Sequence, residues 1–138
     1  MKLPTLAALV CLAATGPALA APKQHLVIDH SSPALMDQAT AKAAWNQHLT
    51  ARVVKLYPVS KWGFSSQVEG GFDEAKNCVV TARAMMLPRA GKVLQFVPNK
   101  SATAFASQAG ATADQCRALA KTKLDEVIVA VRSSLLAN

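Results

Sequence analysis

The chain has 138 residues, a mass of 14.5 kDa and a formal net charge of +7. This length corresponds to one domain. Hydrophobic residues make up 51% of the chain and charged residues 17%. That composition excludes disordered, collagen-like and low-complexity proteins and predicts a packed core.

The start of the chain has the pattern of a secretory signal peptide. Lys2 precedes an apolar run over residues 6–14, and small residues follow up to Ala20, as in an A-x-A cleavage site. The run is shorter than the roughly 20 residues that span a bilayer. We predict cleavage after Ala20, one secreted domain over residues 21–138, and a location in a bacterial periplasm. Cys11 is removed with the signal peptide.

Two cysteines remain in the predicted mature chain, Cys78 and Cys116. A single even pair in an oxidising compartment predicts one disulfide. The alternatives are a metal pair or a reactive thiol. Neither cysteine has another Cys or His at ligand spacing, and the chain has no C-x-x-C motif. We therefore predict no metal site and no cofactor.

Two segments have helical periodicity. A first helix is predicted over residues 33–57, because Ser32 can cap its start, apolar residues recur on one face, and Pro58 ends it. Thr112 and Gln115 have the spacing of a capping box, which predicts the start of a C-terminal helix.

Four segments between these helices have strand patterns. Apolar and polar residues alternate over 62–69 and 78–86, and turn sequences lead into 93–97 and 101–107. Such short connections favour antiparallel pairing in a meander. The stretch 25–28 is either a short strand or an extended arm. The predicted fold is a two-layer α+β sandwich with an N-terminal helix, a four-stranded antiparallel meander, a C-terminal helix and one disulfide.

Three segments of the chain carry a resemblance to a known family: Cys78 to Arg83 (CVVTAR), the turn Pro88 to Lys92 (PRAGK), and Cys116 to Ala120 (CRALA) with Lys123 and Leu124. Together they resemble the C-terminal domain of TolA and, more distantly, TonB. The resemblance implies a module that binds other envelope proteins through a sheet edge, with no catalytic residues to carry over. This chain departs from that family in a longer segment between the cysteines and in an additional strand.

The residues that most often carry chemistry form no recognisable catalytic set. The serines lie in no G-x-S-x-G context. His25, Asp29 and His30 form either a metal site or a polar arm, and we favour the arm because the two histidines point to opposite faces of an extended strand. His48 has no partner evident from its spacing in the sequence and is expected to be a surface or half-buried residue. We therefore predict that the protein is not an enzyme.

The positive charge favours an acidic protein partner or an anionic envelope surface. The cations are spread along the chain and aromatic residues make up only 5%, so we expect no nucleic-acid partner. The predicted partner-binding surface is the sheet face directed away from the helices, with Val79, Arg83, Met85, Gln95 and Phe105.

Together these features predict a small non-enzymatic periplasmic protein-binding module, an accessory component of an envelope complex. The alternative is a periplasmic inhibitor or immunity protein against a toxin or a hydrolase. A small hydrolase is a third, less favoured class, because 118 mature residues without a recognisable nucleophile, base or metal cluster make an unusual enzyme.

Export is directly testable. We expect mass spectrometry of the protein from its host to find a mature N-terminus at or next to Ala21, because signal peptidase cuts after the small residues that precede it. Recovery of the chain with residues 1–20 attached would contradict the predicted compartment.

Overall fold

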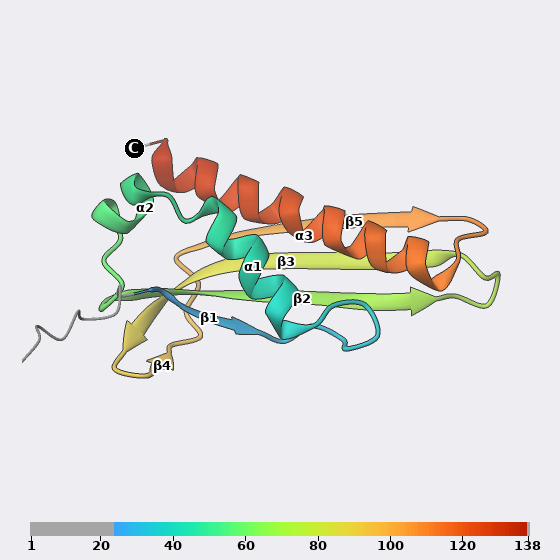
Figure 1. Ribbon diagram of the computed structural model, residues 1–138, viewed down its shortest axis with the longest axis horizontal. Helices are drawn as coiled ribbons and strands as arrows, with labels where there is room; N and C mark the ends of the chain where they lie inside the picture. The colour runs from blue at the N-terminus through green and yellow to red at the C-terminus, as the bar shows by residue number, and fades with distance from the viewer. Residues whose placement is uncertain (1–23, 138) are drawn as a thin grey trace, which may run out of the picture.

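The computed structural model describes residues 24–137, which form a sheet with helices packed on one face (Figure 1). The predicted signal peptide lies outside these residues. The elements in chain order are β1 (Leu26–Asp29), α1 (Gln38–His48), α2 (Ala51–Leu56), β2 (Trp62–Phe72), β3 (Cys78–Ala90), β4 (Val93–Leu94), β5 (Lys100–Gln108) and α3 (Ala113–Leu136). The predicted two-layer α+β fold is confirmed, with a helical segment between β1 and β2 and a long helix after β5.

The central strand of the sheet is β3, which pairs antiparallel with β2 on one side and with β5 on the other. The stretch predicted as a strand or an arm is the strand β1, and it pairs parallel with β2. The predicted strand 93–97 is too long, because β4 has two residues and pairs only with the end of β3. As a result β5 lies beside β3 and not beside the strand that precedes it in sequence.

The main core lies between this sheet and the helices. Alternate residues of β3 from Cys78 to Met86 are buried on the helix side, and the matching alanines of β5 pack against the same core. The small side chains of Ala82 and Ala84 leave room for α3 at close range, where Leu124 and Ile128 are fully buried. Trp45 of α1 stacks on Phe64 with ring centroids 4.6 Å apart.

The first helix begins later than predicted. Ser32 does not cap it, because the turn after Ser32, in which its carbonyl accepts from the N–H groups of Leu35 and Met36, ends before the helix starts at Gln38. Asp37 is the cap, with its side chain accepting from the Thr40 N–H. A carboxylate at this position satisfies an N–H that the helix leaves unpaired.

The predicted single helix is two helices. The chain leaves helical geometry at Leu49 and Thr50, and α2 starts after Thr50, whose backbone is extended. The break lets α2 place Val53 in the core and lets the Tyr57 hydroxyl donate to the Leu135 carbonyl near the end of α3. Apolar periodicity continues across the break, so it does not reveal the change of direction.

The C-terminal helix starts as predicted. Thr112 and Gln115 form a complete capping box, and Asp114 lies in the first turn. The Cys78–Cys116 disulfide is present, with 5.6 Å between the two Cα atoms, and joins the start of β3 to the first turn of α3. It therefore ties the two layers together at one end of the sheet.

Removal of this disulfide should lower stability. The bridge closes a loop with a sequence separation of 38 residues. Closing a loop of that length lowers the conformational entropy of the unfolded chain, which stabilises the folded state by about 4 kcal/mol. We expect the variant with Cys78→Ala and Cys116→Ala to lose about that much free energy of unfolding, measured by urea titration with circular dichroism. A loss below about 1 kcal/mol would contradict this role of the bridge.

Candidate protein-binding surface

One edge of the sheet is formed by β5. Among residues 24–137, β5 pairs with β3 only, so the other side of its backbone is not used in the sheet. Its alanines face the helices and are partly buried, whereas Ser101, Thr103, Phe105 and Ser107 are exposed on the opposite face. No charged residue and no proline occurs between Ser101 and Gln108. Natural edge strands usually carry such residues to prevent pairing with another chain.

The face away from the helices, here called the outer face, is open beside this edge. Gln67, Glu69, Thr81, Arg83 and Thr103 line a shallow hollow of about 280 Å³. Arg83 lies between Gln67 and Thr103 in the strand register. Phe105 lies directly opposite Thr81 and is 65% exposed. Arg83 and Phe105 thus lie near each other on a mostly polar face.

The structure places the five predicted partner-binding residues in different surroundings. Val79, Arg83 and Phe105 lie on the outer face, with Arg83 and Phe105 exposed and Val79 partly buried. Met85 is only 3% exposed, so the expectation that it is an accessible anchor is wrong. Gln95 is exposed, but it follows β4 in a loop and is not part of a strand.

Met85 is buried because the chain folds back over this part of the outer face. Residues 91–99, here called the flap, leave the end of β3 through a turn at Gly91 and return to β5. Leu94 of the flap packs with Met85 and Leu87 in a second, smaller core. The pairing of β1 with β2 needs the glycine at position 63, because a Cβ there would lie 2.8 Å from the Leu26 carbonyl oxygen, and Leu94 Cδ2 of the flap, 2.5 Å from the same point, would also have to move.

The sequence between Glu74 and Asp114 contains no acidic residue. This segment includes β3, the flap and β5, and its cations are Lys76, Arg83, Arg89, Lys92 and Lys100. The net positive charge is therefore concentrated in this segment of the sheet. The Lys and Arg residues themselves are spread along the whole chain. Counting acidic residues by segment would have revealed this asymmetry from the sequence.

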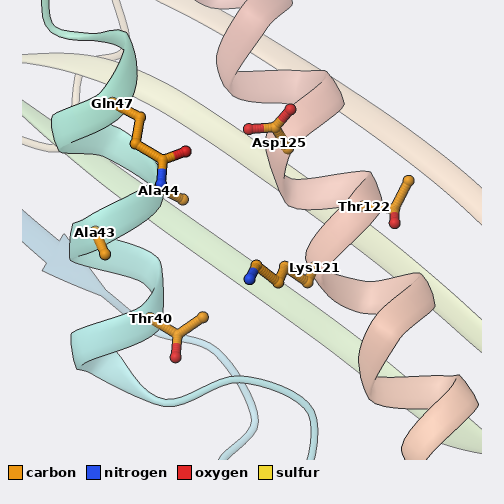
Figure 2. A pocket seen from close by; sticks show the side chains of 7 residues that line it. All are labelled: Thr40, Ala43, Ala44, Gln47, Lys121, Thr122 and Asp125. Atoms are coloured by element: carbon orange, nitrogen blue, oxygen red, sulfur yellow. The ribbon is translucent and has the colours of Figure 1, made fainter.

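On the helix side, a groove of about 480 Å³ runs between α1 and α3 (Figure 2). Gln47 from α1 and Lys121 from α3 extend into the space between the two helices. Thr40, Ala43, Ala44, Thr122 and Asp125 complete its lining.

The carboxylate of Asp125 is already used in a contact between the helices. Its Oδ1 lies 2.7 Å from Nε2 of His48, and Nη1 of Arg132 lies 3.2 Å from Nδ1 of the same ring. A guanidinium can only donate, so Nδ1 accepts and Nε2 donates to Asp125. His48 is half-buried as expected, and its partners are not evident from spacing because they lie far along the sequence on α3.

His25, Asp29 and His30 do not come together. His25 is buried, with Nε2 2.8 Å from the Tyr57 carbonyl oxygen and its ring edge-on to Phe64. Asp29 accepts hydrogen bonds from the hydroxyls of Ser31 and Ser66. His30 is exposed, with its ring 5.8 Å from that of Phe96 in the flap. Within residues 24–137 no three His, Cys, Asp or Glu side chains form a group that could hold a metal ion.

No protein-family model and no curated protein matches the sequence. Two solved structures of PelC dodecamers from Paraburkholderia phytofirmans are similar in backbone. One has a TM-score of 0.42 at 12% identity, over 80% of this chain and 91% of the PelC chain. The other, a PelC variant, has a TM-score of 0.39 at 16% identity, over 88% and 93% of the two chains. These comparisons assign no family, so what this chain does has to follow from its own surface.

His25 should make stability depend on pH. Burial lowers the pKa of His25; the hydrogen bond to Tyr57 opposes this shift, and the positive charge of Arg89 adds to it. Below the ordinary His pKa of about 6.5, the unfolded chain therefore binds a proton that the folded chain resists. We expect the free energy of unfolding to fall as pH drops from about 6.5 to 5.

The matched variant is His25→Gln, which keeps a donor near Tyr57 but does not titrate. The difference in unfolding free energy between the two proteins should change across this pH range. Hydrogen bonds to Thr40 and Asn77 lower the pKa values of Asp37 and Asp73. Their contributions to stability are therefore lost only at lower pH and do not interfere with this measurement. Parallel pH profiles of wild type and variant would contradict the role of His25.

Proposed function

We propose that this protein is a non-enzymatic module that binds an extended segment of another protein along the free edge of β5. The observation that carries the proposal is a nine-residue edge strand without charge or proline after its first residue, with Phe105 exposed at its middle. An added strand would pair with the unused backbone groups of β5, and alternate side chains would provide specificity.

The outer face supplies a second contact for the same partner. Side chains of an added strand that point to this face come next to Phe105 and close to Arg83. Aromatic residues and arginines provide much of the binding energy in protein interfaces. The segment 75–113 has no acid, so the partner that suits it best carries Asp or Glu in or beside the bound segment, at positions away from Glu69 of β2, which lines the hollow with Arg83.

The compartment is part of the proposal. A disulfide between the only two cysteines of the predicted mature chain fits an oxidising environment such as the periplasm. Among residues 24–137, no helix is both long enough and apolar enough to cross a bilayer. The resemblance to the TolA C-terminal domain points to the same mode of binding, and we propose an accessory role in an envelope complex. An inhibitor or immunity protein would use the same edge.

The test is site-specific cross-linking in the host. With p-benzoylphenylalanine in place of Phe105, we expect ultraviolet light to join the protein to a distinct partner. The same group in place of Lys42, an exposed residue of α1 on the helix side, should give no such product. The identity of the cross-linked protein separates the accessory role from the inhibitor role. Equal labelling at both positions would contradict the β5 site.

Two substitutions should then abolish capture of that partner without unfolding the protein. Phe105→Ser removes the apolar contact and Arg83→Glu reverses the charge. Both side chains are exposed, so each variant should stay within about 0.5 kcal/mol of wild-type stability. The matched charge reversal is Lys42→Glu, which should keep full binding. Hydrogen exchange should also show new protection of β5 amides in the complex, and its absence would exclude pairing along this edge.

A further inference from the structure

The flap presents three large apolar side chains to solvent. Val93 is 64% exposed, Phe96 63% and Val97 69%. They lie within five consecutive positions of the flap, which covers part of the outer face through Leu94. The core formed by Leu94 does not use them. Phe96 contacts the ring of His30, but most of its surface stays free.

The tip is held in place by the fold. Leu94, on the inward side of the flap, is buried against Met85 and Leu87. The backbone N–H of Gln95 donates to the Pro88 carbonyl at 2.9 Å, and that of Asn99 to the Met86 carbonyl at 3.0 Å. The apolar side chains are therefore fixed outward before any partner arrives, which reduces the entropy lost on binding.

Cations surround this tip. Lys92 directly precedes Val93, and Lys100 follows the flap at the start of β5. Lys61 is close to the same corner, since its carbonyl accepts from the Arg89 N–H. No acidic residue occurs in the sequence from Ala75 to Ala113. The tip is thus a group of apolar side chains within a segment whose charged residues are all basic.

The flap also lies away from the helices. Figure 1 shows β4 and its loop at a corner of the sheet, on the opposite side from α1 and α3. Gln24, the first residue that the structure describes, lines a shallow hollow with Arg89 and Gly91 at this corner. The β5 edge used in the proposed function runs along the other side of the sheet from β1.

We propose that the flap docks on the surface of an anionic lipid bilayer. Val93, Phe96 and Val97 enter the boundary between headgroups and acyl chains, and Lys92 and Lys100 remain at the level of the lipid phosphates. Apolar insertion combined with attraction of lysines to anionic lipid is the usual basis of interfacial binding. The cores of protein interfaces are instead depleted in lysine. A protruding apolar tip flanked by lysines therefore fits a bilayer better than a protein pocket.

The first experiment is co-sedimentation of the mature protein with vesicles. We expect binding to vesicles of phosphatidylcholine and phosphatidylglycerol, weaker binding at high salt, and little binding to phosphatidylcholine alone. The variant with Phe96→Ser and Val97→Ser should bind the anionic vesicles about tenfold more weakly or worse. Lys92→Glu should lose about fivefold or more, because it removes one attraction and adds a repulsion.

Two controls isolate the flap. Leu56→Ser changes another exposed apolar residue, on α2 in the helix layer, and should bind vesicles like wild type. Phe105→Ser should also keep vesicle binding, although the proposed function predicts that it loses the protein partner. The flap variants should in turn keep the cross-link from position 105. Failure of either proposal is therefore visible separately from failure of the other.

A spectroscopic experiment tests insertion itself. In the variant Phe96→Trp, we expect the indole emission to shift to shorter wavelength on anionic vesicles and to be quenched by brominated acyl chains. Wild-type protein, with Trp45 and Trp62 only, provides the background. Vesicle binding that is unchanged in the flap variants, or no binding by wild type, would overturn the proposal. So would a dimer, seen by sedimentation velocity, that Phe96→Ser dissolves, because the tip would then be an interface between two copies.

Discussion

Strand β3 has apolar residues on both faces along part of its length, and most of the architecture follows from the need to cover them. Its helix-side residues form the main core with α1 and α3. Met85 and Leu87 face the other way and would expose a large apolar area if the outer face were bare. The flap covers them with Leu94. The outer face is consequently divided into a covered half and an open half.

This division determines where the protein can meet partners. In the covered half the flap itself becomes the surface, and its outward residues are apolar with lysines beside them. In the open half the strands remain accessible, and Arg83 and Phe105 stand near the edge of β5. The two surfaces differ in chemistry, since one is a rigid apolar tip and the other offers backbone groups together with a few side chains. A module that rests on a membrane by its flap would leave β5 free to pair with an extended segment of a second protein.

The helix layer contributes rigidity. The Cys78–Cys116 bridge ties one end of α3 to β3, and the Tyr57 hydroxyl contacts the Leu135 carbonyl near the other end. Between these points His48 links α1 to Asp125 and Arg132. These contacts join α1, α2, α3 and the sheet, and the groove between α1 and α3 shares Asp125 with them. The helix layer therefore supports the sheet, and the residues proposed to bind partners all lie on the opposite side or at the sheet edge.

The sequence by itself determined the features that depend on local pattern. Alternation in β2 and β3, the capping box at Thr112 and the pairing of the last two cysteines all follow from residue type and spacing, because caps, strand faces and a single thiol pair are short-range or unambiguous signals. Tertiary structure alone decided what covers each face. The turn after Ser32 does not continue into the helix, while the Ser32 N–H donates to the Val68 carbonyl of β2, and Met85 is buried because the flap returns over it. Each of these outcomes depends on how separate segments of the chain pack against one another, and an alternating pattern shows that a strand has two faces but not which elements will fold against them.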